Sequence, residues 1–354
     1  MQDTEGLSHM VHKIPSPHSL STGIGALPFL DPVRACDTVL GIYQEIPYIP
    51  TLPNRDILES IVFCDSSLLP GRVIHDGRLY ADSGKDASAE MEQIYIDFME
   101  GSSERYALSA DYASGFAEMM HRDLSGSLLL KCQVTGPVTF GMQVVDCKKR
   151  PVYYDDQFAD VLSKMTALRA MWCENAMKDI SGVEETLVVL NEPYLAALGS
   201  SVIPIDRDCV ISGWNDISSL VSGGLGIHCC SNTDWNFIIS LNPSVISFDA
   251  YTGAREFLLY MDDIIRYMEK GGVIAWGIVP ADPGIFAQES QNTLIEKYCE
   301  IRNQIVSVMD PGLFDAQSII TPTCGIRFAD EPGSIAIMEA SVKISRHVRG
   351  LSCS

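Results

Sequence analysis

The chain has no hydrophobic run long enough to cross a membrane, and its basic residues are few. A membrane helix needs about 20 apolar residues, whereas the longest apolar run, 272–278, has only the length of a strand. The 25 Lys and Arg residues stand against 46 Asp and Glu residues, which gives a net charge of −21 at pH 7. Because no basic cluster occurs, we expect neither nucleic acid nor a membrane surface as a partner.

Signals for disulfides, secretion and dinucleotide binding are missing as well. The eleven cysteines are odd in number and scattered through the 354 residues, unlike those of a disulfide framework. The first twenty residues are polar where a signal peptide is apolar, so we expect a cytoplasmic protein with free thiols. No Gly-x-Gly-x-x-Gly sequence follows the first predicted strand, and nothing therefore supports a dinucleotide site.

Short apolar runs alternate with segments of helical periodicity. The runs predicted as strands are 22–26, 129–134, 186–190, 225–227, 245–248, 273–278 and 318–321. Helical spacing of apolar residues marks 154–178, 257–268 and 293–309. Uniformly apolar strands that are each followed by a helix indicate a parallel sheet covered by helices. The pattern predicts an α/β fold, a (β/α)8 TIM barrel over 21–350, preceded by an N-terminal extension over 1–20.

The region before the second predicted strand is less regular. Residues 44–105 contain many turn formers and charges, which indicates elaborated N-terminal loops rather than a second domain. We expect the eighth strand somewhere within 57–73 and a hairpin at 75–78, because Asp-Gly favours a tight turn. A doubly wound sheet is the alternative architecture.

The active site of such a barrel lies at the C-terminal ends of its strands. Small and polar residues recur at the ends of the predicted strands, namely Gly25, Thr135, Gly136, Asn191, Glu192, His228, Cys229, Cys230, Asp249, Asp282 and Cys324. Of these, Gly25, Thr135, Gly136, Asn191 and Glu192 are candidates for substrate binding, since glycines admit a close approach and the polar side chains can hold an amino or carboxyl group. Asn191, Glu192 and Asp282 are the catalytic candidates, although no specific role follows for Asp282. Tight turns are the alternative for the segments of Gly25, Thr135 and Gly136, and a turn with a helix cap is the alternative for Asn191 and Glu192.

One imidazole and several thiols at strand ends predict a metal site. Thiolate and imidazole are ligands that zinc prefers, and a zinc centre with an open position can bind a substrate. Neighbours in a strand point to opposite faces, so His228 and Cys230 can share a site while Cys229 points away. Cys229 is an alternative ligand if the chain has already left the strand at this point. Cys324 lies far along the chain, which favours a catalytic centre over a zinc finger. Buried free thiols are the alternative.

The sequence leaves open three interpretations of the role of Asp249. The carboxylate can be a fourth zinc ligand, or it can accept the imidazole proton of the ligating histidine. It can equally be an ordinary helix N-cap, because it directly follows a predicted strand.

Four short motifs resemble those in the catalytic half of cobalamin-independent methionine synthase. They are Thr-Gly-Pro-Val-Thr at 135–139, Asn-Glu-Pro at 191–193, His-x-Cys at 228–230 and Cys-Gly at 324–325. The chain is also similar to the wider superfamily of uroporphyrinogen decarboxylase and the methylcobamide:thiol methyltransferases. The resemblance covers about 23–346. It implies a barrel that binds Zn²⁺ through His228, Cys230 and Cys324, with Asp249 where the synthase has glutamate.

Two departures from the family pattern bear on the substrates. The family's Asp-Glu-Pro, whose aspartate holds the homocysteine amino group, is here Asn-Glu-Pro, and a neutral amide holds an ammonium group less strongly. The folate-dependent synthase is about twice as long as this chain, so we expect no counterpart here of the half that helps to bind folate polyglutamate, and a charge of −21 disfavours a polyanionic tail. We therefore expect methylcobalamin or a methylated corrinoid as donor. No Asp-x-His-x-x-Gly signature occurs, so the corrinoid would be free or on a separate corrinoid protein.

The expected function is zinc-dependent transfer of a methyl group to a small-molecule thiol, such as homocysteine to give methionine. A methylcobamide:coenzyme M-type methyltransferase is the first alternative. The second is a uroporphyrinogen decarboxylase-like enzyme without metal, although that chemistry needs several arginines around an acidic substrate. The third is a non-catalytic zinc or corrinoid-handling protein.

Overall fold

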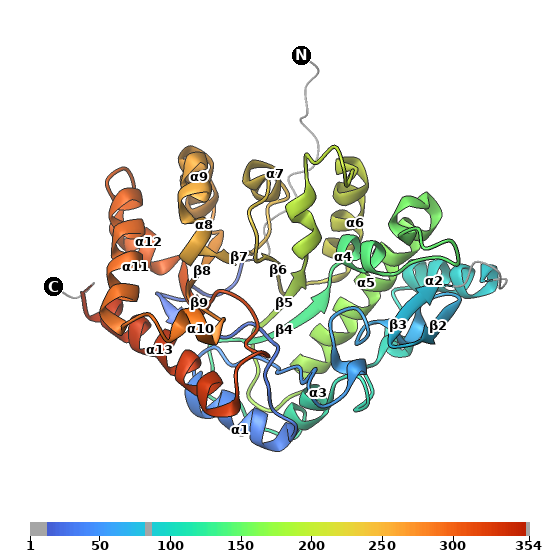
Figure 1. Cartoon of the computed structure of the whole chain (residues 1–354), viewed down its shortest axis with the longest axis horizontal. Helices are drawn as coiled ribbons and strands as arrows, with labels where there is room; N and C mark the ends of the chain where they lie inside the picture. The colour runs from blue at the N-terminus through green and yellow to red at the C-terminus, as the bar shows by residue number, and fades with distance from the viewer. Residues whose placement is uncertain (1–12, 82–86, 352–354) are drawn as a thin grey trace, which may run out of the picture.

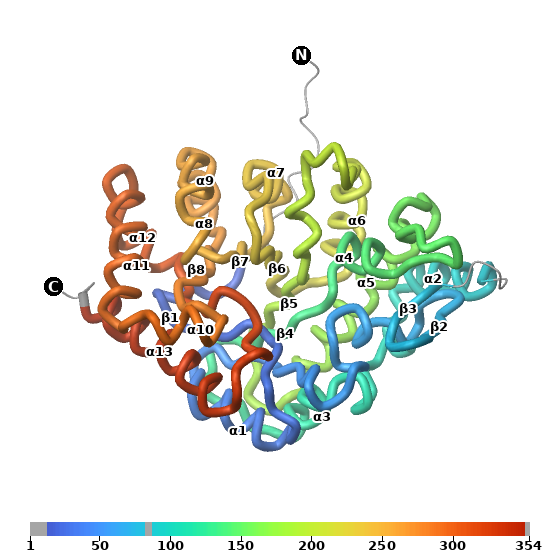
Figure 2. The backbone as a smooth tube through the Cα atoms, viewed as in Figure 1, coloured from blue at the N-terminus to red at the C-terminus, as the bar shows by residue number. Residues whose placement is uncertain are grey.

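The structure, a computed structural model, describes residues 13–81 and 87–351 (Figures 1 and 2). One curved sheet contains seven strands of this part of the chain, and every neighbouring pair is parallel. Its order is β1-β9-β8-β7-β6-β5-β4. The strands are β1 (Leu20–Ser21), β4 (Leu130–Thr135), β5 (Thr186–Asn191), β6 (Gly224–Cys229), β7 (Val245–Asp249), β8 (Val273–Val279) and β9 (Ser318–Pro322). A separate hairpin pairs β2 (Arg72–His75) with β3 (Arg78–Ala81).

Helices lie outside the curve of the sheet (Figure 1). They are α1 (Pro32–Ile42), α2 (Ser88–Glu100), α3 (Ser114–Met119), α4 (Pro137–Gln143), α5 (Asp156–Lys178), α6 (Arg207–Leu220), α7 (Trp235–Ser240), α8 (Ala250–Phe257), α9 (Met261–Glu269), α10 (Pro283–Phe286), α11 (Gln291–Val306), α12 (Pro311–Ala316) and α13 (Glu331–Leu351). Short 3-10 turns are η1 (Ile57–Glu59), η2 (Ser66–Leu68), η3 (Glu104–Tyr106), η4 (Val152–Tyr154), η5 (Pro193–Ala197) and η6 (Leu258–Tyr260). None of the helices within the described ranges is long and apolar enough to cross a membrane.

Most predicted elements occur close to their expected positions. The first strand is the exception, since it lies at Leu20–Ser21 instead of 22–26. The segment predicted as one helix over 257–268 is divided into η6 and α9. The predicted hairpin is confirmed: its turn residues Asp76 and Gly77 have φ angles of 49° and 66°, which suit the tight turn between two antiparallel strands.

The expected eighth strand within 57–73 is wrong. That stretch carries η1 and η2, and it ends in β2 of the separate hairpin. Segment 47–51 instead lies between the two edges of the sheet. The N–H of Ile49 donates to the carbonyl of Lys131 in β4 at 2.8 Å, and the N–H of Thr51 donates to the carbonyl of Gly25 after β1 at 3.2 Å. Pro47 and Pro50 lack an N–H, which limits this segment to single bridges. The described sheet is thus a curled seven-stranded one, and a closed eight-stranded barrel is not confirmed.

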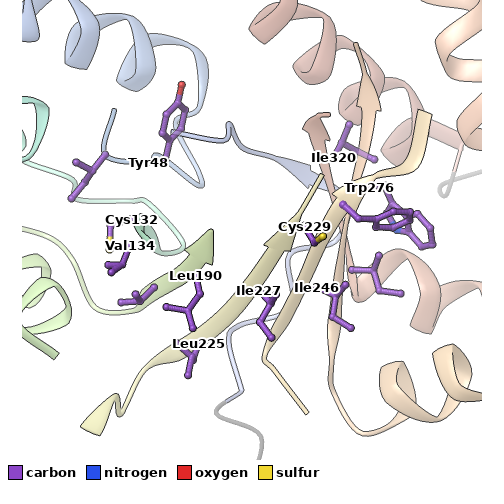
Figure 3. Packing of buried hydrophobic residues seen from close by; sticks show 14 of the residues in the cluster. Tyr48, Cys132, Val134, Leu190, Leu225, Ile227, Cys229, Ile246, Trp276 and Ile320 are labelled. Carbon is purple, nitrogen blue, oxygen red and sulfur yellow. The ribbon is translucent and has the colours of Figure 1, made fainter. Parts of the chain in front are cut away.

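Side chains of alternate residues enter two different cores. The concave side of the sheet holds an apolar cluster of Ile14, Leu20, Ile46, Leu129, Leu187, Val189, Val245, Val273, Ala275 and Ile319. The convex side packs against the helices, and Figure 3 shows Leu225, Ile227 and Cys229 of β6 in this second cluster. Apolar layers therefore fill the lower part of the concave side, and polar residues gather at the C-terminal ends of the strands.

Lys131 breaks the apolar pattern of β4. Only 3% of it is exposed, and its Nζ lies 5.4 Å from the centre of the Tyr48 ring. No carboxylate or hydrogen-bond acceptor in the described part of the chain pairs with this amine. Burial removes water from the charged form, which lowers the pKa of Lys131 from 10.5 to about 7. The folded chain therefore favours a neutral amine at this position.

We expect Lys131→Met to stabilise the protein most at pH 7 and below. The unfolded state binds more protons than the folded state between about pH 7 and 10.5, so this lysine's destabilising effect fades as the pH rises through that window. Urea unfolding at pH 7 should show a gain of at least about 1 kcal/mol for the variant, and the gain should shrink toward pH 10. Other titrating groups are common to both proteins and cancel in the difference. A gain that is absent, or constant with pH, would contradict the prediction.

Candidate metal centre

Three predicted ligands from two distant parts of the chain meet above the sheet. His228 lies near the end of β6 and Cys230 follows that strand, whereas Cys324 comes two residues after β9. One potential ligand atom of each residue lies within 4.8 Å of the others. Two strands separate β6 from β9 in the sheet order, so the meeting depends on the curvature of the sheet and on the short segments after the strands.

The imidazole of His228 is oriented by its neighbour in β7. Its Nδ1 lies 2.9 Å from Oγ of Ser247, and the two residues are paired in the register of the strands. Its Nε2 is buried and has no hydrogen-bond partner within the described residues. A proton on Nδ1 that is donated to Ser247 leaves the lone pair of Nε2 for a metal ion. Such an unpartnered buried nitrogen beside two thiols fits the coordination preferences of zinc.

The two thiols differ in their protonation. The hydrogen bond from Cys324 and the nearby imidazole of His228 stabilise a Cys230 thiolate, and they lower the pKa of Cys230 to about 4. The same hydrogen bond, together with burial, raises the pKa of Cys324. A thiolate, a thiol and an imidazole thus share one small volume, and a divalent cation is the partner that would satisfy all three.

Cys229 points away from this group, as alternation along a strand predicts. It is 1% exposed and belongs to the convex core (Figure 3). Its thiol donates to the carbonyl oxygen of Ser231 at 3.4 Å. Burial raises the pKa of Cys229 to about 12, so this sulfur is a neutral packing group.

Asp249 is the N-cap of α8. Its Oδ1 accepts a hydrogen bond from the N–H of Thr252 at 3.0 Å, and its Oδ2 accepts one from the hydroxyl of Thr252 at 2.7 Å. The imidazole partner of His228 is Ser247, so Asp249 does not fill that role. The three-residue ligand group does not include Asp249 either. Its place as a fourth ligand stays a prediction.

A pocket that is open to solvent lies over the ligand group. It is lined by Ile24, Gly25, Ala26, Thr51, Pro53, Glu59, Ile61, Cys64, Gln133, Thr135, Asn191, Pro193, His228, Cys230, Cys324, Gly325, Arg327 and Phe328. The predicted substrate-binding residues Gly25, Thr135 and Asn191 therefore share a pocket with the three predicted ligands. Gly136, Glu192, Asp249 and Asp282 are not part of its lining.

Glu192 links the end of β5 to the start of α4 through hydrogen bonds. Its Oε1 accepts from the N–H of Val138 at 3.0 Å, and its Oε2 accepts from the N–H of Thr139 at 2.8 Å and from the Thr139 hydroxyl at 2.6 Å. Gly136 leaves room for this carboxylate, since a Cβ there would lie 2.2 Å from Cδ of Glu192. Burial raises the pKa of Glu192 to about 7, against the opposing effect of the Thr139 hydrogen bonds. These contacts anchor two of the sequence motifs to each other, and roles for both residues in substrate binding or catalysis stay predictions.

Asn191 is held in place by Gln133, a residue that is not among the predicted site residues. Nε2 of Gln133 donates to Oδ1 of Asn191. Gly25 makes room for Gln133, because it has a φ angle of +76° and a Cβ there would lie 2.4 Å from Oε1 of Gln133. The signal for Gln133 was its place in β4, where Lys131, Gln133 and Thr135 alternate with apolar residues.

Other pocket residues come from segments without a recognisable pattern. Glu59, Cys64, Arg327 and Phe328 lie in irregular segments or short turns, where no periodicity indicates which side chains face the site. Asp282, by contrast, is an exposed N-cap of α10 that accepts from the N–H of Ile285 at 2.9 Å. Its catalytic role stays a prediction without a contact to the pocket.

Comparison with known proteins gives a fold relationship. No family model matches the chain, and no curated protein matches it. A B12-independent methionine synthase from Shewanella sp. W3-18-1, in complex with selenomethionine, is 14% identical with a TM-score of 0.46, over 64% of this chain and 63% of that one. A putative vitamin-B12 independent methionine synthase from Listeria monocytogenes is 11% identical with a TM-score of 0.53, over 93% of this chain and 98% of that one. At this identity the Listeria protein shows a shared fold.

We expect one zinc ion per chain in anaerobically purified protein, and its loss in Cys324→Ala. The matched control is Cys229→Ala, which removes a neighbouring buried thiol that points into the convex core. Metal analysis after gel filtration should give about one zinc per chain for the wild type and the control, and close to none for Cys324→Ala. Equal zinc contents in the two variants would contradict the assignment of the ligands.

Ser247→Ala should weaken zinc binding without abolishing it. The change removes the hydrogen bond that fixes the imidazole tautomer and ring orientation, and such losses typically lower metal affinity about 10–100-fold. Competition with a chromophoric chelator at constant pH measures the affinity. Ser247→Thr, which keeps the hydroxyl, should lie closer to the wild type than to Ser247→Ala. An affinity unchanged in Ser247→Ala would show that the serine does not orient the ligand.

Proposed function

We propose that this protein is a zinc-dependent methyltransferase that moves a methyl group to the sulfur of a small thiol. The observation that carries the proposal is the convergence of His228, Cys230 and Cys324 within 4.8 Å in an open pocket. Three protein ligands leave a position for a substrate, as in catalytic rather than structural zinc sites. Asp249 as a fourth ligand is compatible with this proposal only if the substrate thiol replaces it on the ion.

When bound, zinc would lower the pKa of a substrate thiol and keep its sulfur nucleophilic. Ser247 orients the imidazole of His228 for this role. Gln133 fixes Asn191, whose side chain would hold the polar end of the acceptor. The pocket brings acceptor and donor together in one orientation. In the reaction the acceptor loses its thiol proton to solvent, a sulfur–carbon bond forms, and the bond between the methyl group and its donor breaks.

Homocysteine, which would give methionine, is the acceptor that we propose first. The shared fold with the Listeria protein supports this reaction class, since that protein is a putative vitamin-B12 independent methionine synthase. Neutral Asn191 in the pocket favours a second acceptor class, coenzyme M-type thiols that have no ammonium group. A reducing compartment such as the cytoplasm would keep the thiols of the site available.

We propose methylcobalamin, or a methylated corrinoid on a separate protein, as the methyl donor. A net charge of −21 disfavours the polyanionic tail of a folate polyglutamate. A methylated folate is the competing donor. The metal-free decarboxylase is disfavoured because Arg327 is the single arginine among the described pocket residues.

Zinc-loaded protein should demethylate methylcobalamin in the presence of homocysteine or 2-mercaptoethanesulfonate. The cobalamin absorbance change gives the rate, and mass spectrometry identifies the S-methylated product. Cys324→Ala should lower the rate at least about 100-fold, because the thiol then keeps its proton, whereas Cys229→Ala should retain most of it. Transfer from methyltetrahydrofolate alone would replace the corrinoid donor by folate. Transfer from neither donor, with zinc bound, would overturn the proposed function.

A further inference from the structure

Arg327 is a cation in the pocket that has no carboxylate partner among the described residues. It lies three residues after Cys324 and lines the same pocket as the three proposed ligands. No ion pair forms between its guanidinium and any residue of the described ranges, although the chain has 46 acidic residues. An arginine that is partly buried beside a substrate pocket and lacks an anion is suited to bind one from the substrate.

The loop that carries Arg327 is fixed to the mouth of the pocket. The N–H of Ile326 donates to the carbonyl of Ala26 at 2.8 Å, and Nδ2 of Asn54 donates to the carbonyl of Arg327 at 3.1 Å. Cζ of the guanidinium lies 4.5 Å from the centre of the Phe328 ring. Phe328 itself is 75% exposed. An exposed aromatic ring that supports a cation restricts its conformations before a ligand binds.

The carboxylate of Glu59 does not compete for this cation. Glu59 is the one carboxylate among the described lining residues, and it is 1% exposed. It already accepts hydrogen bonds from the N–H of Leu52 at 3.1 Å, from Arg55 at 2.9 Å and from Ser114 at 2.6 Å. The pocket therefore offers a cation for an anionic group, and no uncommitted carboxylate for an ammonium group.

Asn191 adds a second donor to the pocket. Its Oδ1 accepts from Gln133, so its amide N–H groups are left for a ligand. Amide and guanidinium donors together match the oxygens of a carboxylate or sulfonate.

We propose that Arg327 is a specificity-determining residue that binds the anionic group of the acceptor thiol. This inference rests on the proposed function, because the sulfur of the same molecule would occupy the metal centre. The acceptor is then a short thiol with a carboxylate or a sulfonate, and an amino group contributes little to its affinity. Arg327 selects such a thiol over neutral and cationic thiols of the same length.

Calorimetric titration of the zinc-loaded protein with three matched thiols tests this selection. We expect 2-mercaptoethanesulfonate to bind at least about tenfold more tightly than 2-mercaptoethanol, and 2-aminoethanethiol to bind most weakly. Arg327→Gln should reduce the preference for the sulfonate to within about twofold and leave the affinity for 2-mercaptoethanol unchanged. Arg327→Lys should restore part of the preference, since it restores the charge without the planar fork.

A charge-matched control separates the local contact from the change in net charge. Arg346→Gln removes the same charge from an exposed position on α13, and it should keep the wild-type preference. Equal affinities for the three thiols in the wild type, or a preference that survives in Arg327→Gln, would overturn the inference. It is also overturned if Arg327→Gln weakens methylcobalamin or folate binding alone, since the residue would then serve the donor.

A zinc-free measurement separates this inference from the proposed function. Saturation-transfer NMR with ethanesulfonate, which has no thiol, reports on the anion site alone. Binding to the wild type and its loss in Arg327→Gln support the anion site even if the protein fails to take up zinc, an outcome that overturns the proposed function only. No binding of ethanesulfonate to the wild type would overturn the assignment of Arg327.

Discussion

The parallel register of the sheet is the constraint on which the metal centre depends. It pairs Thr135 with Asn191, Asn191 with His228, and His228 with Ser247 across four neighbouring strands. The paired residues form one polar row, because equal alternation in parallel strands puts them on the same face. A slip of one residue in any strand would turn its polar residue into the helix-covered core. The apolar cluster on the concave side, with Val189, Val245 and Val273 below this row, disfavours such a slip energetically.

Buried carboxylates hold the irregular segments against the ends of the strands. Asp65 accepts from the N–H of Thr135 at 2.8 Å and lies 3.7 Å from Arg169, which ties the loop around η2 to β4 and α5. Glu192 and Glu59 make equivalent contacts on either side, and each accepts hydrogen bonds from backbone N–H groups. Hydrogen bonds to carboxylate oxygens are directional. The floor and walls of the pocket are therefore fixed by carboxylates whose hydrogen bonds go to other parts of the protein.

Sequence pattern sufficed for the six strands β4 to β9 and for the convergence of His228, Cys230 and Cys324, because both follow from local periodicity and from the common edge of a parallel sheet. It failed for the segment at 47–51, which lies between the edge strands, because Pro47 and Pro50 interrupt its strand pattern. It also gave no hint that Ser247 supports the imidazole, since the contact joins residues nineteen positions apart. Such partners are determined by the register of the strands. A single sequence does not reveal this register when several sheet topologies are possible.

The placement of charge explains how an acidic protein can bind an anion. Many of its aspartates are helix N-caps, among them Asp31, Asp155, Asp206, Asp234, Asp249, Asp282 and Asp310, where they accept backbone N–H groups at the starts of helices. Exposed charges are screened beyond about 8 Å at physiological salt, so they weaken binding inside the pocket only slightly. Among the described lining residues of the pocket, the charged groups are Arg327, the carboxylate of Glu59, which already accepts three hydrogen bonds, and the proposed metal ligands. The net charge of −21 therefore does not determine the charge inside the pocket, and the pocket can still present a cation to its ligand.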